Sequence, residues 1–463
     1  MKHQDILDRA LRIVRPTARE RKILEATAEK ALQIVSELAS GLPGIVDVSL
    51  EGSAAKDTWI KERMEADVFI HFDPSVPREA MEREVVRIGM EAIRRMGGEP
   101  MLMYAEHPYV EGTINNVTID IVACYRVKPP NWISATDRTP YHTRYVRERM
   151  TRELRDQVRL LKKFLLSCEA YGAEIKVRGF SGYLSELLIL AHGGFYETVM
   201  SASRWRPPIV IDLEGHYGSR DDVVEAFQGQ SLIVVDPVDR RRNVAAAVSD
   251  TRLAEFILAS KLFAQKPSLK FFRAREPRTS LGTLRRLIRK RNILFIEFRV
   301  GGRIPPDVLW GELRRTEKGI RKALERLGFQ VYRSDSWTNL RDCVISLELD
   351  SSTLPSYELR RGPPAYMDNS LDFVLKWVRK GVSGPWLDGF RLYVLSERRE
   401  TRAEKLLRSE IRMGRVSLAK DLHDKVKKAR ITTSLNNLPR KLLRDPDFQK
   451  HLHRFLQHRP NYL

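Results

Sequence analysis

The chain has 463 residues, of which 42% are hydrophobic, so it can bury more than one core and wholesale disorder is excluded. Lys and Arg total 81 against 60 Asp and Glu, and the net charge of +21 favours a polyanionic partner such as nucleic acid. The alternative is a charge-rich protein of the kind that thermophiles contain. Three scattered cysteines predict a reducing compartment and no zinc site. The N-terminal segment is too charged for a signal peptide, and no apolar run approaches roughly 18 residues, so we expect a cytoplasmic protein with no membrane partner.

The first part of the chain predicts a helix and then a mixed α/β unit. Apolar residues recur at helical spacing over residues 4–40. Residues 45–125 alternate between strand and helix signals, with strands at "IVDVSLEGS" and "ADVFIHF", one more strand within "EPMLMYAEHPYVEGT", and a hairpin at "TINNVTIDIVACY". A short Gly-Ser turn follows the first strand. These elements predict a small mixed sheet.

The rest of the chain alternates between helical and mixed segments. Helices dominate residues 150–205, and short strands are expected at "PPIVIDLEG" and "SLIVVDPVD". Residues 267–277 have the composition of a linker. Residues 279–463 alternate again and allow a β-α-β-β-α-β order, which some RNA-binding sheets share. From Ser417 onward the tail is predicted to be helical and basic.

Three carboxylates occupy apolar strands and point to a metal site. Glu65 and Asp67 share one face of their strand and lie about 7 Å apart, and Asp120 follows in another apolar strand. If the strands are neighbours, the three converge and need a cation, for which Mg²⁺ is the natural choice. The alternative is that the first two face solvent on an amphipathic edge strand. The Gly52-Ser53 turn offers backbone N–H groups to a phosphate.

The stretch "GSAAKDTWIKERMEADVFIHF" resembles the signature of the DNA polymerase β-like nucleotidyltransferases. More specifically, the chain resembles the archaeal-type, class I CCA-adding enzymes, a family of tRNA nucleotidyltransferases. The resemblance rests on "YAEHPYVEGT", "VTIDIVACYRVKPP", "SATDRTPYHTRYV", "VRLLKKFL", "YGAEIKVRGFSGYLSELLI" and "VVDPVDRRRNVAAAVS". Together these stretches cover roughly residues 50–265, and residues 279–463 resemble the family more weakly.

The resemblance implies an α+β fold in three domains. Residues 1–146 would form the polymerase β-like catalytic head with its small mixed sheet. Residues 147–266 would form a helical, nucleotide-binding central domain. Residues 267–463 would form an α/β RNA-binding body with a helical tail.

The implied activity is template-independent addition and repair of the 3′-terminal CCA of tRNA from CTP and ATP, by two-metal nucleotidyl transfer to the RNA 3′-hydroxyl. The catalytic residues Glu65, Asp67 and Asp120 would hold Mg²⁺. The tRNA would be gripped by its acceptor and TΨC half, and a homodimer is implied. The alternatives are a poly(A) polymerase or other template-independent RNA nucleotidyltransferase, and a non-catalytic RNA-binding protein with the same fold.

The resemblance also implies a set of nucleotide-binding residues: Ser53, Lys56, His142, Lys162, Tyr171 and Arg242. Lys56 replaces a frequent Arg of the family and can place a charge on phosphate, but it lacks the bidentate fork of Arg. Further pocket residues are His107, Thr139 and Asn243.

Each of these residues also has a simpler interpretation. Lys162 could be solvated on an amphipathic helix, Tyr171 could cap a core, and Arg242 could belong to a solvated basic run. His142 could be a surface histidine and Thr139 a helix cap.

Overall fold

The computed structural model describes residues 2–104, 106–273, 279–301, 304–460 and 462. The chain forms two compact units, Met1–Glu276 with Arg459–Leu463, and Pro277–His458, each described separately below. Within the described residues, no helix combines the length and the apolar character needed to cross a membrane.

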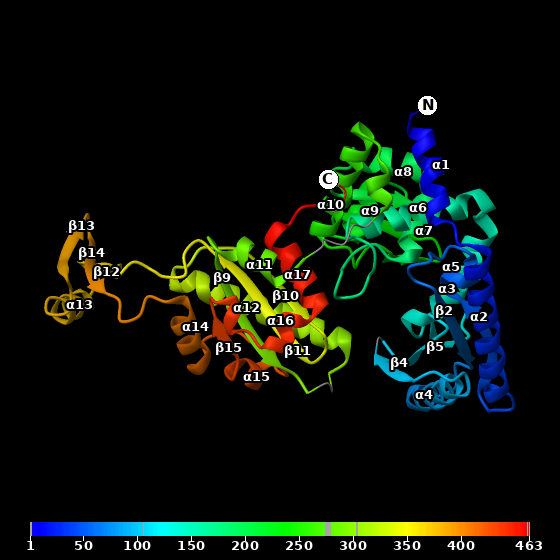
Figure 1. The fold of residues 1–463 in the computed structure, drawn as a ribbon, viewed down its shortest axis with the longest axis horizontal. Coiled ribbons are helices and arrows are strands. Elements are labelled where there is room, and N and C mark those ends of the chain that lie inside the picture. The colour runs from blue at the N-terminus through cyan, green and yellow to red at the C-terminus, as the bar shows by residue number, and fades with distance from the viewer. Residues whose placement is uncertain (1, 105, 274–278, 302–303, 461, 463) are drawn as a thin grey trace. The chain divides into compact units, whose positions relative to one another are not determined.

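The first unit begins with two helices and a five-stranded sheet (Figure 1). Its elements are α1 (Lys2–Val14), α2 (Ala18–Ala39), β1 (Ile45–Glu51), α3 (Gly52–Lys56), β2 (Glu65–Phe72), α4 (Arg78–Arg95), β3 (Met101–Tyr104), β4 (Pro108–Ile114) and β5 (Val117–Tyr125). The strand order is β1-β2-β5-β4-β3, in which only β2 and β5 run parallel. The predicted hairpin is confirmed: Asn115 and Asn116 adopt φ of 52° and 64° between β4 and β5. The segment expected to hold one strand holds two, β3 and β4.

One face of this sheet is apolar and packs against α2 and α4. Ala66, Val68 and Ile70 of β2 are fully buried there, as are Ile119 and Ile121 of β5. Because side chains alternate along a strand, the acids of β2 and β5 project from the opposite face. Since β2 lies between β1 and β5, the interpretation of an edge strand is wrong.

The remainder of the first unit is largely helical around an aromatic core. Its elements are η1 (Ala135–Arg138), α5 (Thr139–Arg149), α6 (Arg152–Ser167), α7 (Gly182–His192), α8 (Phe195–Ala202), β6 (Ile209–Asp212), α9 (Arg220–Ala226), β7 (Leu232–Asp236), β8 (Asp239–Asn243), α10 (Asp250–Gln265) and η2 (Leu269–Phe272). The side chains of Ser181 and Ser249 cap α7 and α10. Strands β6, β7 and β8 form a small sheet. Phe164 stacks on Phe271, with ring centroids 5.4 Å apart, at the centre of the core.

The second unit contains two separate sheets. Its elements are α11 (Leu281–Ile288), β9 (Asn292–Arg299), α12 (Pro306–Leu327), β10 (Val331–Thr338), β11 (Asp342–Leu349), β12 (Tyr357–Pro364), α13 (Ser370–Trp377), β13 (Ser383–Asp388), β14 (Arg391–Glu397), α14 (Ala403–Arg412), α15 (His423–Lys427), β15 (Arg430–Thr432), η3 (Leu435–Asn437), α16 (Arg440–Arg444) and α17 (Pro446–Gln457). The sheets have the orders β10-β11-β9-β15 and β12-β14-β13.

Two expectations for this unit are wrong. A single β-α-β-β-α-β sheet does not form, because β14 pairs with β12 and β13 instead of joining β9 and β11. The tail is not wholly helical, because β15 pairs with β9 at the edge of the larger sheet. Alternation of apolar residues predicts that a segment is extended but not which strand it pairs with, and this is why both expectations failed.

Candidate active site

Strand register places a row of carboxylates across the face of the five-stranded sheet that is opposite α2 and α4. Asp67 of β2 lies opposite Asp120 of β5 in the parallel pair. Glu51 of β1 lies opposite Asp67, and Glu111 of β4 lies opposite Asp120. Paired residues project from the same face, and so do residues two apart on one strand, so Glu65 joins the row. The sequence motif therefore supplies three of five neighbouring acids.

Burial makes this row costly to ionise. Burial, together with the charge of Glu65, raises the pKa of Asp67 to about 7. Burial and the charge of Asp67 raise the pKa of Asp120 well above its usual range. The Oδ1 atom of Asp120 is buried and has no hydrogen-bond partner. Oxygen ligands in this condition suit a divalent cation.

The side chains do not form a closed metal cage. Across the described ranges, no three His, Cys, Asp or Glu side chains are grouped closely enough to hold a metal ion. The fit to a cation therefore rests on the backbone register, the unpartnered oxygen of Asp120 and the raised pKa values of the two aspartates.

Helix α3 lies directly against Asp67. Gly52 has φ of +68°, and a Cβ at that position would lie 1.8 Å from Oδ2 of Asp67, so only glycine is accommodated. Ser53 follows in the first turn of this five-residue helix. The expected Gly-Ser turn is thus the start of a short helix. It brings the Ser53 backbone next to the acidic row.

A buried ion-pair network joins α3 to α6 and α7. The Lys56 Nζ donates to Oε2 of Glu186 at 2.6 Å, and the Thr58 hydroxyl donates to Oε1 of Glu186 at 2.5 Å. The Lys162 Nζ donates to the Thr58 carbonyl at 2.9 Å and lies 4.0 Å from Oε1 of Glu186. Burial lowers the pKa of Lys162 to about 8. Lys162 is therefore not a solvated surface lysine.

The Tyr171 hydroxyl and the Lys162 Nζ both lie near Gly182, the first residue of α7. A Cβ at Gly182 would lie 3.4 Å from the Tyr171 hydroxyl and 3.5 Å from the Lys162 Nζ. The guanidinium of Arg63 lies 5.1 Å from the centroid of the Tyr171 ring. The charge of Glu65 contributes to the pKa of both Tyr171 and Lys162, so both groups lie within electrostatic reach of the acidic row.

Asp236, at the end of β7, connects two further predicted residues. It is fully buried. Its Oδ2 accepts from Arg242 at 2.7 Å and lies 2.8 Å from Nε2 of His142, and its Oδ1 accepts from Tyr183 at 3.3 Å. Burial opposes ionisation, but these partners hold the pKa of Asp236 below its usual value. The Lys56 Nζ lies 5.6 Å from the centroid of the Tyr183 ring, which links this group to the ion-pair network.

The remaining three predicted residues are His107, Thr139 and Asn243. The Nδ1 of His107 lies 3.1 Å from Oε1 of Glu82 on α4. Thr139 is half-buried at the first position of α5. The amide of Asn243 accepts from the Val234 and Ala245 N–H groups and donates to the Leu232 carbonyl, so it holds β7 and β8 together.

Sequence reasoning missed five residues of this region: Glu51, Glu111, Tyr183, Glu186 and Asp236. Glu186 and Asp236 were detectable, because each is an acid within the apolar runs "SELLIL" and "LIVVDPVD". Glu51 and Glu111 were not, because their place in the row depends on strand pairing.

Comparison with known proteins first defines the class of the chain. Residues 28–142 match the family model described as a nucleotidyltransferase domain, which contains the Gly-Ser helix and the acidic strands. Residues 156–273 match "tRNA nucleotidyltransferase, second domain", and residues 289–434 match "CCA-adding enzyme, C-terminal domain". Nucleotidyltransferases of this kind generally use divalent metal ions.

Curated relatives then define the family. The CCA-adding enzyme of Methanothermobacter thermautotrophicus is 36% identical over 414 residues, covering 88% of this chain and 89% of the relative. That of Pyrobaculum neutrophilum is 38% identical over 415 residues, covering 89% and 94%. The chain belongs to the archaeal-type CCA-adding enzymes, which act on tRNA with nucleotide substrates. The polymerase β-like head and the tRNA nucleotidyltransferase activity are thereby confirmed, and the two alternative functions are not favoured.

A solved structure of the poly(U) polymerase Cid1 is 12% identical, with a TM-score of 0.46, over 59% of this chain and 100% of that chain. This similarity is too weak to carry an argument about function.

Proposed function

We propose that the chain completes and repairs the tRNA 3′ end by adding CCA from CTP and ATP, with Mg²⁺ held by Glu65, Asp67 and Asp120. The observation that carries this proposal is the parallel register of Asp67 and Asp120 beside Gly52 of α3. When bound, Mg²⁺ would supply charge stabilisation as the RNA 3′-hydroxyl attacks the α-phosphate in line and pyrophosphate leaves. The experiment is to incubate the protein with Mg²⁺, CTP, ATP and tRNA lacking CCA. Failure to extend this tRNA would refute the proposal.

The protein side chains are proposed to hold the nucleotide in two places. Ser53, Lys56, Lys162 and Tyr171 bind its phosphates and ribose, since they lie along the edge of the acidic row. The Lys56 Nζ lies 2.6 Å from Glu186, whereas the Lys162 Nζ lies 4.0 Å from it. The positive charge of Lys162 is therefore less neutralised by Glu186. His142 and Arg242 lie on the side of the base, fixed through Asp236. His107, Thr139 and Asn243 stay predictions.

Arg242 is proposed to read the incoming base together with the growing RNA end. CTP and ATP must use one site, because the described part of the chain contains one such acidic row, and the object that changes between additions is the RNA 3′ end. The guanidinium donates to Asp236 through NH1, while the side chain is 38% exposed, so other N–H donors can reach a base edge.

We expect Arg242→Lys to lower discrimination of CTP and ATP against UTP and GTP by about 5- to 150-fold, the range for losing one good base contact. The measurement is relative kcat/KM for the four nucleotides on tRNAs ending before C, after C and after CC. Arg241→Lys is the matched comparison and should leave selectivity unchanged. Altered selectivity in Arg241→Lys alone would assign the role to the other arginine. No change in either variant would leave selection to pocket shape or backbone.

Nucleotide affinity should fall as pH rises through about 8. The pKa of Lys162 is lowered from its usual 10.5 to about 8 by burial, so the ammonium loses its proton, and its attraction for phosphate, in that range. The measurement is the Kd for CTP and ATP by calorimetry from pH 7 to 9.5. Lys162→Arg should bind with a flatter pH profile, because guanidinium stays protonated. A flat wild-type profile would remove Lys162 from the phosphate site.

The wider organisation completes the proposal. Residues 1–146, 147–266 and 267–463 serve as catalytic head, central nucleotide-binding domain and RNA-binding body, supported by family matches at 28–142, 156–273 and 289–434. The body would bind the acceptor and TΨC half of tRNA, and the overall charge of +21 supports a polyanionic partner. The proposed location is the cytoplasm, since the proposed substrate is tRNA.

A homodimer is proposed to form through the second sheet of the second unit and its helix α13. Helix α13 has no buried residue, and this module exposes Tyr366 and Phe390 to 74%, Leu375 to 71% and Leu371 to 70%. Exposed apolar side chains in such numbers mark an association surface. Their apolar character fits a second copy better than it fits RNA phosphate.

Leu371→Glu/Leu375→Glu should convert the dimer to a monomer, because burying two carboxylates in an apolar interface is costly. The measurement is sedimentation velocity, with Glu325→Gln on the exposed face of α12 as a control that keeps the wild-type state. A wild-type protein that sediments as a monomer, or a double variant that stays dimeric, would refute this interface.

A further inference from the structure

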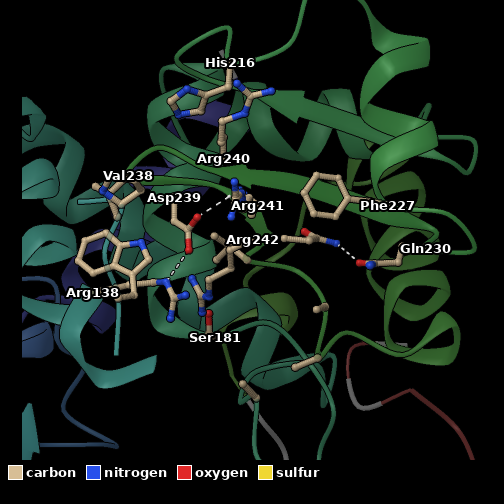
Figure 2. Close-up of a pocket in the computed structure, with 17 residues that line it drawn as sticks. Arg138, Ser181, His216, Phe227, Gln230, Val238, Asp239, Arg240, Arg241 and Arg242 are labelled. Carbon is tan, nitrogen blue, oxygen red and sulfur yellow. Dashed lines mark hydrogen bonds and ion pairs between the residues drawn. The ribbon is translucent and has the colours of Figure 1, made fainter. Parts of the chain in front are cut away.

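A cavity of about 890 Å³ opens beside β8 (Figure 2). Four arginines and two aromatic side chains are among its lining: Arg138, Arg240, Arg241, Arg242, Trp132 and Phe227. The volume is near the upper end of small-ligand pockets. Arg242 belongs both to this lining and to the cluster at Asp236, so the cavity borders the base side of the nucleotide site.

The charge of the cavity favours an anion. Among the described lining residues the one acid is Asp239, and it is already engaged by the Arg138 Nε at 2.7 Å and by the backbone N–H of Arg241 at 3.2 Å. Figure 2 shows Arg138 and Arg241 on either side of this carboxylate. In the described part of the chain, no acidic side chain pairs with the guanidinium of Arg241 or Arg240. These two exposed cations are available to phosphate.

Trp132 gives the cavity a platform for a flat ring. The Arg138 guanidinium lies 5.5 Å from the indole centroid, and the Tyr141 ring packs edge-on at 5.3 Å. The indole Nε1 is buried and has no hydrogen-bond partner, so it is a donor without an acceptor. Proteins hold unpaired nucleotides with this combination of an aromatic ring, a stacked guanidinium and nearby cations.

We infer that the cavity is a subsite for one unpaired nucleotide of the RNA 3′ strand. The base stacks on the Trp132 ring, while Arg241 binds the adjoining phosphate and Arg240 adds positive charge to the cavity wall. This inference rests on the proposed function. The incoming nucleotide has the same chemistry, but its triphosphate must reach the acidic row. Ser53, Lys56 and Lys162 do not line the cavity, so an RNA nucleotide is the better occupant.

The test uses the full chain and a tRNA ending after CC, with 2-aminopurine at the unpaired nucleotide before CCA. Stacking quenches this base, and we expect quenching by wild type and by Trp132→Phe, which keeps a ring. Trp132→Leu should abolish the quenching and weaken tRNA binding by about 5- to 150-fold, the range for one base–aromatic stack. Ile133→Ala, an exposed neighbour outside the lining, is the control and should match wild type.

Two further measurements distinguish an RNA nucleotide from the incoming nucleotide as the ligand of this cavity. The Kd for CTP should be unchanged in Trp132→Leu, and a loss of CTP affinity with intact RNA quenching would overturn the assignment to RNA. Arg241→Gln should reduce the slope of log K against log salt for tRNA by about one, as for one lost phosphate contact, and an unchanged slope would overturn its phosphate role. CCA addition by Trp132→Leu at saturating tRNA would leave the proposed function standing. Wild-type quenching without any CCA addition would refute the function but not the subsite.

Discussion

Asp67→Asn and Asp120→Asn should each abolish nucleotide addition, by on the order of a thousand-fold or more in kcat/KM, while tRNA affinity stays near that of wild type. The two carboxylates lie opposite each other on adjacent parallel strands, and burial raises the pKa of both, as expected of side chains that bind a divalent cation. Loss of a metal-holding oxygen removes several kcal/mol of transition-state stabilisation. The affinity for tRNA depends on basic residues, so it should not fall together with kcat/KM.

The matched control is Asp47→Asn on β1 of the same sheet. Asp47 is exposed, and its carboxylate lies 3.7 Å from Arg126, so the change removes a charge of equal size away from the row. Single-turnover addition and filter-binding Kd values are measured for all three variants. Wild-type turnover in either Asp67→Asn or Asp120→Asn would contradict the metal assignment. A parallel loss of tRNA affinity would show that the residues support RNA binding instead.

Glu186→Leu should destabilise the first unit by about 3–5 kcal/mol. Glu186 is fully buried and accepts from Lys56 at 2.6 Å and from Thr58 at 2.5 Å, with Lys162 at 4.0 Å. Removal of Glu186 leaves the buried Lys56 ammonium without its carboxylate partner. The double change Lys56→Met/Glu186→Leu should recover part of the loss, because an apolar pair replaces the charged one.

Urea unfolding, followed by circular dichroism, measures both variants. Glu225→Leu on the exposed surface of α9 is the control and should change the midpoint little, since surface substitutions usually stay within about 0.5 kcal/mol. If Glu186→Leu unfolds at the wild-type urea concentration, the network contributes nothing to stability. If the double variant is less stable than the single one, Lys56 is stabilised by groups other than Glu186.

Much of the local structure could be predicted because it depends on neighbouring residues. Alternation of apolar residues located β2 and β5 and the hairpin formed by β4 and β5. The acids Glu65, Asp67 and Asp120 stood out because they interrupt apolar strands. Their convergence depended on one further condition, the adjacency of β2 and β5.

The rest depended on contacts between distant segments. Pairing of β14 with β12 and β13, and of β15 with β9, could not be read from alternation alone. Glu51 and Glu111 enter the acidic row only through cross-strand register. Asp236 stands out in the sequence as an acid in an apolar run, but its contacts with His142 and Arg242, 94 and 6 residues away, depend on the fold.

One acidic row is proposed to build a fixed three-nucleotide end on tRNA without a template. The most direct measurement is sequencing of RNA 3′ ends after wild-type protein, Mg²⁺ and all four nucleotides are incubated with tRNA ending before CCA, after C and after CC. All three substrates are expected to end in CCA, and tRNA already ending in CCA is expected to remain unextended. Homopolymeric A or U tails, or continued extension beyond CCA, would contradict it.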